Sequence, residues 1–380
     1  MTKSIFLYAV AFCINLIFLG CHSSPNQTMT VKLGAILPLS GDGASYGKSM
    51  QNGIELYLTQ RSKETSPQIS VIYEDTQLDQ VQAVSGFRKL ISINEVPAVM
   101  GPFSSSQMLA VAPVAEQQER VLISGTATSP AITDAGDFIF RIIPSDTHDG
   151  RVVANLIKQQ LPNTTTVSIV HVNNDFGIGI RDAFKNEAMG LGLKIILEIA
   201  YPQENRDFRV QIQKIIKKAP DAVFLVGYKE MGLFLRQSEQ AGLKCKIVAT
   251  GLMEDPEIIK VAGKAADGVL YSYPAFRVDS KNELVASFVD AYKQKYGSEP
   301  DAIAALGFDL AHLLADVLEA GKPYNAQTIK NRLYKVKDFP GVAGNINFDI
   351  NGDVEKSSGV KIVKDGEFHW VTETLNLSRR

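Results

Sequence analysis

The chain has 380 residues, more than a single hydrophobic core usually supports, so we expect two domains. Hydrophobic residues make up 45% of the sequence and charged residues 21%, which is ordinary for a globular protein. The formal net charge of −2, with no long basic run, argues against nucleic acid as a partner.

The first 20 residues have the pattern of an export signal. Lys3 precedes an almost unbroken apolar run, Ile5 to Leu19, which is too short to span a membrane and is typical of a signal-peptide core. The run leads into Gly20-Cys21 and then a polar stretch, which resembles the bacterial lipoprotein processing site. An ordinary cleaved signal is the alternative. We predict lipid acylation at Cys21, a tether over residues 21–30, and a protein anchored in the periplasm or on the outer face of the cell membrane.

The cysteines and histidines predict neither a disulfide nor a metal site. Cys13 would be removed with the signal and Cys21 would carry lipid, which leaves Cys245 without a partner. The five histidines are scattered, with no spacing typical of metal ligands. We expect no metal and no other cofactor.

After residue 30, apolar runs alternate with stretches of helical periodicity. We predict a first series of strands at 31–37, 69–73, 96–100, 121–123 and 138–143, with helices at 46–60, 80–93 and 107–118. A second series has helices at 150–160, 175–189, 208–218, 230–241 and 255–261, with strands at 167–171, 193–200, 222–226, 246–249 and 268–272. Repeated units of this length predict an α/β fold of two doubly wound parallel sheets with helices on both faces.

The last hundred residues depart from this alternation. Helical periodicity predicts long helices at 281–296 and 301–320 and a shorter one at 326–334. Asn351-Gly352 is a strong hairpin signal, and a final hairpin is predicted from strands 360–363 and 368–372. Because no flexible linker separates the two series, we expect two lobes in close contact, with a cleft at the ends of their strands.

Two hydroxyl-rich loops follow neighbouring strands of the first series. Ser104 to Ser106 come after Gly101-Pro102, and Ser124 to Pro130 follow the next strand. In an open parallel sheet both loops lie at the carboxyl ends of the strands, where ligands bind. Serines at a helix start leave further amide groups free, which favours an anion such as a carboxylate. The alternative is that these side chains only cap helices and form turns.

Two short motifs raise the possibility of an enzyme. Gly43 to Gly47 fits the G-x-S-x-G pattern of serine hydrolases, but that pattern requires its serine on a sharp turn directly after a strand. Residues 38–42 separate Ser45 from the predicted strand. Gly177-Ile178-Gly179 lacks the third glycine of a dinucleotide-binding loop. We therefore predict that the protein is not an enzyme.

The order of motifs over Val31 to Trp370 resembles the type I periplasmic solute-binding proteins, in the leucine/isoleucine/valine-binding branch that serves ABC importers. The motifs that carry the resemblance are Leu37-Pro38-Leu39-Ser40-Gly41, Tyr46-Gly47, Gly101-Pro102-Phe103-Ser104-Ser105, Ile123 to Pro130, Arg141 to Asp146, Asp207-Phe208, Pro220 to Phe224, Gly227-Tyr228, Arg236-Gln237 and Gly242-Leu243-Lys244.

The resemblance implies two lobes joined by three crossings, which close over a ligand by hinge motion. One lobe would comprise residues 31–144 and 275–345, and the other residues 145–274 and 346–374. The implied partners are a small-molecule ligand and an ABC permease in the membrane, with the protein itself a monomer. A ligand sensor that reports to another protein is the alternative.

The resemblance also implies which residues bind the ligand. Ser104, with Ser105 beside it, would hold a ligand carboxylate. Ala127 would contribute its carbonyl, and Thr128 its amide and hydroxyl.

Aromatic residues would form the walls of the cleft. The resemblance implies that Tyr46 lines the side-chain pocket and that Tyr228 closes over the ligand from the second lobe. Tyr273 or Phe276 is a further candidate. Phe176 stands where the relatives carry a tyrosine, so this wall should be less polar than usual.

A second departure concerns the ligand's ammonium group. The relatives pair it with a glutamate, and the matching position here is Gly251. Because a buried ammonium without a partner is costly, either Glu254 or the hinge residue Asp146 would replace that glutamate, or the ligand has no ammonium. We favour the first possibility and expect a branched-chain or other apolar amino acid. A non-amino carboxylic acid or amide is the alternative.

Overall fold

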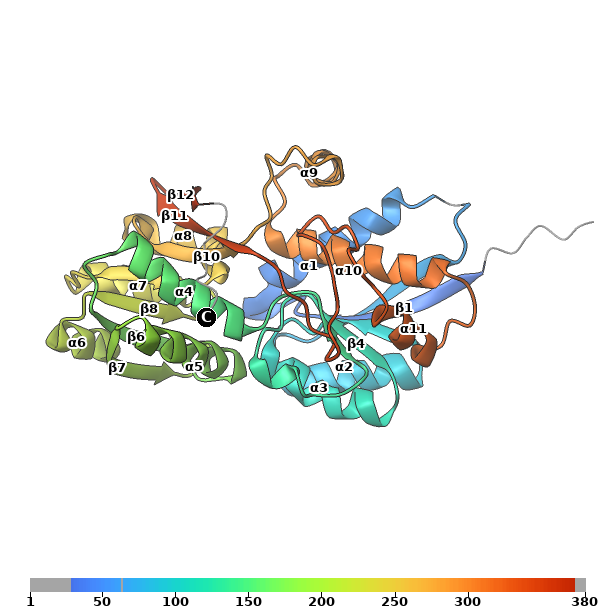
Figure 1. Cartoon of the computed structure of the whole chain (residues 1–380), viewed down its shortest axis with the longest axis horizontal. Coiled ribbons are helices and arrows are strands. Elements are labelled where there is room, and N and C mark those ends of the chain that lie inside the picture. Colours follow the sequence, from blue (N-terminus) through green and yellow to red (C-terminus); the bar gives the residue numbers. More distant parts are fainter. Residues whose placement is uncertain (1–28, 63, 373–380) are drawn as a thin grey trace, which may run out of the picture.

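The computed structural model describes residues 29–62 and 64–372, which form two lobes side by side, each a sheet with helices on both faces (Figure 1). The predicted signal peptide, Cys21 and nearly all of the tether lie outside the described residues, as do residues 373–380. No helix among the described residues is both long enough and apolar enough to span a bilayer.

The first lobe contains a five-stranded, wholly parallel sheet in the order β2-β1-β3-β4-β5. Its strands are β1 (Thr30–Leu37), β2 (Gln68–Asp75), β3 (Ala98–Met100), β4 (Val121–Ser124) and β5 (Ile139–Arg141). Its sequential helices are α1 (Ala44–Gln60), α2 (Gln80–Ser92) and α3 (Ser105–Gln117). In this order the chain leads from β1 to β2 in one direction and from β3 to β4 in the other, so the two connections lie on opposite faces of the sheet. Ligands bind at such a topological switch point.

The second lobe contains a seven-stranded sheet in the order β12-β11-β10-β9-β8-β6-β7. Strands β6 (Thr166–Val172), β7 (Lys194–Tyr201), β8 (Ala222–Val226), β9 (Lys246–Ala249) and β10 (Leu270–Pro274) are parallel, and β11 (Ser358–Lys364) and β12 (Glu367–Thr372) add an antiparallel edge. Its helices are α4 (Asp146–Gln160), α5 (Asp175–Gly190), α6 (Arg209–Lys218), α7 (Met231–Gln240) and α8 (Pro256–Ala262).

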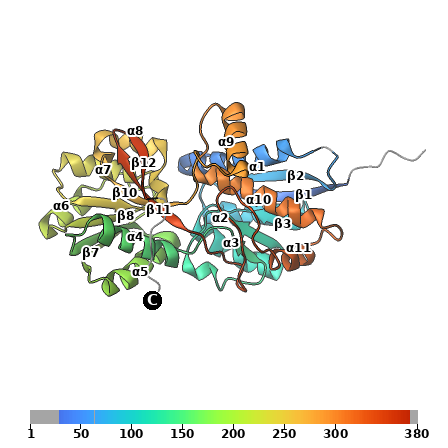
Figure 2. The ribbon, with the colours of Figure 1, turned by 45° about the horizontal axis from the view of Figure 1, so that its top comes forward.

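The C-terminal helices return to the first lobe. Figure 2 shows α9 (Glu283–Tyr296) and α10 (Ala302–Glu319) beside α1, while the β11–β12 hairpin lies with the second lobe. α11 (Ala326–Leu333) follows α10 in the first lobe. Glycines let α1 and α10 approach closely: a Cβ on Gly53 would lie 1.9 Å from the Ala304 carbonyl oxygen, and one on Gly307 would lie 2.2 Å from that of Met50.

The chain crosses between the lobes after β5, after β10 and before β11, which confirms the predicted three-crossing α/β architecture. Arg141 links two of these crossings and is fully buried. Its guanidinium binds the Asp353 carboxylate at 2.6 Å and donates to the carbonyl oxygens of Thr128 and Ser129 at 3.0 and 2.8 Å. We propose lobe boundaries near residues 144 and 275, where the first two crossings lie, and a third between residue 345 and the start of β11 at Ser358.

Two local predictions differ from the structure. Helix α4 begins at Asp146, not at Gly150, because Ser145 caps it and accepts a hydrogen bond from the Thr147 amide. Asn351-Gly352 forms a turn without flanking strands of the described sheets. The turn closes through the Asp349 amide, which donates to the Asp353 carbonyl at 2.9 Å, and the Gly352 carbonyl also accepts from the Arg141 amide at 3.0 Å, which ties the turn to the first crossing. The final hairpin is confirmed as β11 and β12.

Candidate functional site

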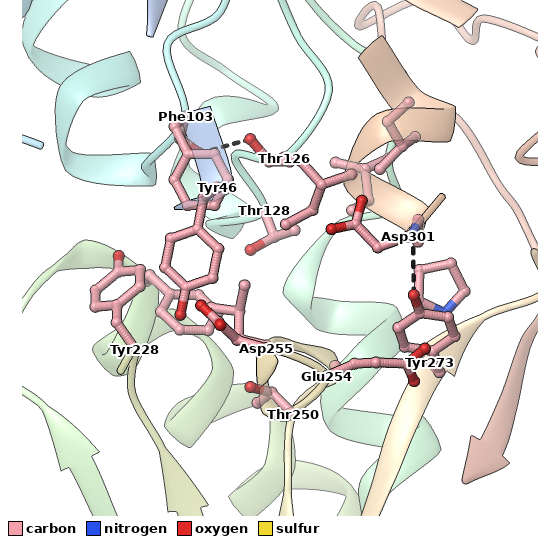
Figure 3. Close-up of a pocket in the computed structure, with 18 of the residues that line it drawn as sticks. Tyr46, Phe103, Thr126, Thr128, Tyr228, Thr250, Glu254, Asp255, Tyr273 and Asp301 are labelled. Atoms are coloured by element: carbon pink, nitrogen blue, oxygen red, sulfur yellow. Dashed lines mark hydrogen bonds between the residues drawn. The ribbon is translucent and has the colours of Figure 1, made fainter. Parts of the chain in front are cut away.

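A cavity of about 140 Å³ lies between the lobes, where the carboxyl ends of both sets of parallel strands face each other. Loops after β1, β3 and β4 line it from the first lobe, and loops after β6, β8, β9 and β10 line it from the second. In Figure 3, Tyr46 and Tyr228 lie on one side and Tyr273 and Asp301 on the other, with Thr128 between them. Its volume suits a small molecule.

Stacked aromatic rings form one wall of the cavity. Tyr46 and Phe103, which follow β1 and β3, stack in parallel with ring centroids 5.1 Å apart. Tyr228 from the second lobe lies 6.5 Å from Tyr46 and 5.8 Å from Phe176. Burial, and then the nearby Asp255 carboxylate, raise the pKa of Tyr46 well above its usual value, so its hydroxyl stays protonated at neutral pH.

The two hydroxyl-rich loops meet at the cavity. Ser104 caps α3, and its Oγ accepts from the Gln107 amide at 3.4 Å. Ser105 Oγ accepts from the amides of Thr128 and Ser129 at 3.1 and 3.0 Å, and so holds the second loop against the first. The Thr128 amide that we expected to bind the ligand is therefore already bonded, whereas its hydroxyl is buried without a hydrogen-bond partner in the structure.

Further buried hydroxyl groups line the cavity without hydrogen-bond partners. They are Tyr46 Oη from the first lobe, Thr250 Oγ1 directly after β9, and Ser272 Oγ within β10. Buried polar groups in folded proteins are nearly always bonded. A polar ligand between the lobes would supply the missing partners.

Every charged side chain that lines the cavity is acidic. These residues are Asp149, Glu254, Asp255 and Asp301. Burial raises the pKa of both Asp149 and Asp301, because the surrounding protein disfavours the charged carboxylate. Asp301 also caps α10, accepting from the Ala304 amide at 2.7 Å, and accepts from Ser49 Oγ at 2.5 Å.

Asp255 projects from the second lobe toward the aromatic wall (Figure 3). Its Oδ1 caps α8 by accepting from the Glu257 amide at 2.8 Å, and its Oδ2 accepts from Ser45 Oγ of the first lobe at 2.9 Å. No basic side chain among the described residues forms an ion pair with it. Asp255 therefore presents a carboxylate to the cavity that a ligand cation could pair.

Glu254 already has partners. Lys361 Nζ lies 2.6 Å from its carboxylate, and Tyr271 Oη donates to Oε2 at 2.7 Å. Although Glu254 lines the cavity, its charge is balanced from within the protein.

Asp146 is fully buried and does not line the cavity. Its amide donates to the Thr128 carbonyl at 2.7 Å, at the first crossing. Burial, and then the neighbouring Asp149, raise the pKa of its carboxyl well above the usual value. Because burial favours its neutral form, Asp146 is poorly suited to pair a ligand cation.

Most of the residues predicted for the site meet at this cavity. Those that line it are Tyr46, Ser104, Ser105, Thr128, Phe176, Tyr228 and Glu254. Ala127 does not line it, and its neighbour Thr126 does. Asp255 was also missed in the sequence analysis. The feature that could have pointed to it is the Asp255-Pro256 pair, which marks the start of α8 directly after the β9 loop.

The motif that suggested a hydrolase lies on this cavity but lacks the required geometry. Ser45 is inside α1, not on a turn directly after a strand, and its hydroxyl donates to Asp255. No cluster of three possible metal ligands occurs in the part of the chain that the structure describes.

Comparison with known proteins identifies the family of this chain. The family model described as "Periplasmic binding protein" matches residues 30–363. The leucine-, isoleucine-, valine-, threonine-, and alanine-binding protein of Pseudomonas aeruginosa is 28% identical over 333 residues, covering 86% of this chain and 87% of that protein.

Two solved structures are similar over nearly their whole length. The leucine-binding protein LivK of Thermotoga maritima has a TM-score of 0.85 at 29% identity, covering 90% of this chain and 97% of that one. The branched-chain amino acid transporter substrate-binding protein LivJ of Streptococcus pneumoniae, solved with isoleucine, has a TM-score of 0.83 at 27% identity, covering 90% and 99%. The chain therefore belongs to the periplasmic binding protein family, as a type I member of the leucine/isoleucine/valine-binding branch.

Proposed function

We propose that the protein binds an α-amino acid with an apolar side chain in the cavity between its lobes and delivers it to an ABC permease. The main support is the placement of two opposite kinds of group around one cavity: hydroxyl-rich loops from the first lobe and an unpaired carboxylate, Asp255, from the second. The relatives support the same ligand class: the Pseudomonas protein is named for leucine, isoleucine, valine, threonine and alanine, the Thermotoga protein for leucine, and the Streptococcus structure holds isoleucine.

The hydroxyl-rich loops suit the ligand's carboxylate. Ser104 lies at the N-terminus of α3, where the first amide groups have no partner within the helix and the helix dipole favours negative charge. Thr128 Oγ1 is a buried donor without a partner on the same side of the cavity. Ser105 Oγ accepts from two amides of the Thr128 loop and so positions that loop, while its hydroxyl hydrogen can still be donated to the ligand.

Asp255 is the partner we propose for the ammonium group. Glu254 is paired with Lys361, and Asp146 lies behind the cavity wall with its neutral form favoured. The structure therefore favours a residue other than the two that the sequence suggested. A charged ligand ammonium would pair with Asp255 Oδ2, beside the Ser45 hydroxyl.

The remaining lining residues suit an apolar side chain. Ile143, Ile303, Leu306 and Pro274 line the cavity together with Tyr273, and Phe276 does not. Burying an apolar side chain among them would contribute about 1.5–3 kcal/mol. We also propose that Cys21 carries a lipid anchor.

A thermal-shift comparison tests this proposal. Leucine should raise the melting temperature, whereas 4-methylpentanoic acid, which lacks the amino group, and the 2-keto analogue should do so much less at equal concentration, because a ligand that binds only the native state stabilises it. Replacing Asp255 by Asn should remove most of the leucine shift. Stabilisation by the deamino acid but not by any amino acid would overturn the proposal.

A further inference from the structure

A buried lysine stands directly behind the cavity wall. Lys361 projects from β11, and its side chain is 8% exposed. Its Nζ lies 4.6 Å from the ring centroid of Tyr273 and 5.2 Å from that of Trp370, so aromatic rings adjoin the ammonium. Such a lysine needs its carboxylate partner, because an isolated buried charge is costly.

The pair with Glu254 determines the charge of one side of the cavity. Glu254 and Tyr273 lie together on this side, opposite Tyr46 and Tyr228 (Figure 3). Both oxygens of Glu254 contact Lys361 Nζ at 2.6 Å, and Tyr271 Oη adds a hydrogen bond. No lysine or arginine lines the cavity itself, so Lys361 is the described basic group that balances this carboxylate.

We propose that Lys361 determines which ligand side chains the cavity accepts, by neutralising Glu254 from behind. This rests on the proposed function, with the ligand's head group at Ser104, Thr128 and Asp255 and its side chain directed toward Glu254 and Tyr273. A cationic side chain there meets a carboxylate that already holds a cation, and an anionic one meets the carboxylate itself. Only an uncharged side chain leaves the pair undisturbed, so this is discrimination by repulsion.

Lys361 acts on the ligand through Glu254 and is therefore a positioning residue. The experiment must measure a quantity that a loss of stability alone would leave unchanged, such as a ratio of affinities. Norleucine, lysine and 2-aminoadipate share one carbon chain and differ in the terminal group. Calorimetric dissociation constants of the mature protein for the three give two ratios, lysine to norleucine and 2-aminoadipate to norleucine. Wild type should bind norleucine most tightly.

The variant Lys361→Met leaves Glu254 unpaired, so the lysine-to-norleucine ratio should shift at least about tenfold in favour of lysine. Lys361→Arg should keep the wild-type ratio, and adding Glu254→Gln to Lys361→Met should restore it. Lys364→Met, on an exposed lysine of the same strand, is the matched control and should change neither ratio. An unchanged ratio in a Lys361→Met protein that still binds norleucine would refute the inference.

Glu254→Gln provides a second test should Lys361→Met fail to fold. Here Lys361 is left unpaired, and the 2-aminoadipate-to-norleucine ratio should shift at least about tenfold in favour of 2-aminoadipate. If it does not shift while norleucine still binds, the inference is wrong. If wild type binds no amino acid at all, it is the proposed function that fails.

Discussion

At the scale of single residues, Ser104 and Thr128 are the groups we propose for the ligand carboxylate. Removing one hydrogen bond to a charged group costs about 1.5–3 kcal/mol, which corresponds to about 10- to 150-fold in affinity. We expect Ser104→Ala and Thr128→Val each to weaken leucine binding by this amount in calorimetry. Ser129→Ala is a suitable control, because Ser129 neighbours Thr128 but does not line the cavity. Losses below about threefold in both variants would place the carboxylate elsewhere.

Some of these residues could be predicted from the sequence because their signal is local. Ser104 and Thr128 each follow a short apolar strand, and the carboxyl ends of parallel strands share one edge of the sheet. The pairing of Glu254 could not be predicted, because Lys361 is 107 positions away and reaches it only through the antiparallel edge of the second sheet. Asp255 was missed because an Asp-Pro pair also occurs at helix starts that have no part in a binding site.

At the scale of elements, the Arg141–Asp353 pair joins the first and third crossings and should contribute strongly to stability. Arg141 is wholly buried, and breaking a buried pair by removing one partner typically costs about 3–5 kcal/mol. We expect Arg141→Met to lower the free energy of unfolding in urea by that amount. Arg181→Met removes a more exposed pair, with Asp182, and should cost about 1 kcal/mol or less. Equal effects of the two substitutions would show that the crossing does not depend on this pair.

Most helices and strands could be predicted from local sequence patterns, whereas the structure at Asn351-Gly352 depends on a distant residue and could not. Each βα unit is a local pattern of apolar periodicity, so α/β alternation follows from the sequence. The turn at Asn351-Gly352 has the composition of a hairpin, but it lies against Arg141, which is more than 200 positions away in the sequence, and not between two paired strands. Strand order in the second sheet likewise depends on contacts between distant parts of the sequence. β11 lies beside β10 although three helices of the first lobe separate them in sequence.

At the scale of the whole molecule, contacts between the lobes hold the cavity closed. Ser45 Oγ donates to Asp255, and the Asp175 amide donates to Ser106 Oγ at 3.1 Å. Ser45 and Asp255 both line the ligand cavity. Ser106 and Asp175 are next in sequence to Ser105 and Phe176, which line it. Ligand binding and lobe closure therefore involve the same residues, so a ligand that pairs Asp255 also stabilises the closed arrangement.

The last prediction concerns where the whole molecule is held. The apolar run that ends at Leu19-Gly20-Cys21, followed by a polar stretch, predicts acylation at Cys21. One acyl chain anchors a protein only marginally and two or more anchor it stably, so a multiply acylated protein should be recovered with the membrane fraction. Cys21→Ala should move it to the soluble extracytoplasmic fraction without altering leucine affinity, because the cavity lies within residues 45–306. Cys245→Ala, on the free cysteine of the second lobe, is the matched control and should stay with the membrane. If Cys21→Ala remains in the membrane fraction, the lipid anchor is wrong, whereas the cavity and its ligand are tested independently of it.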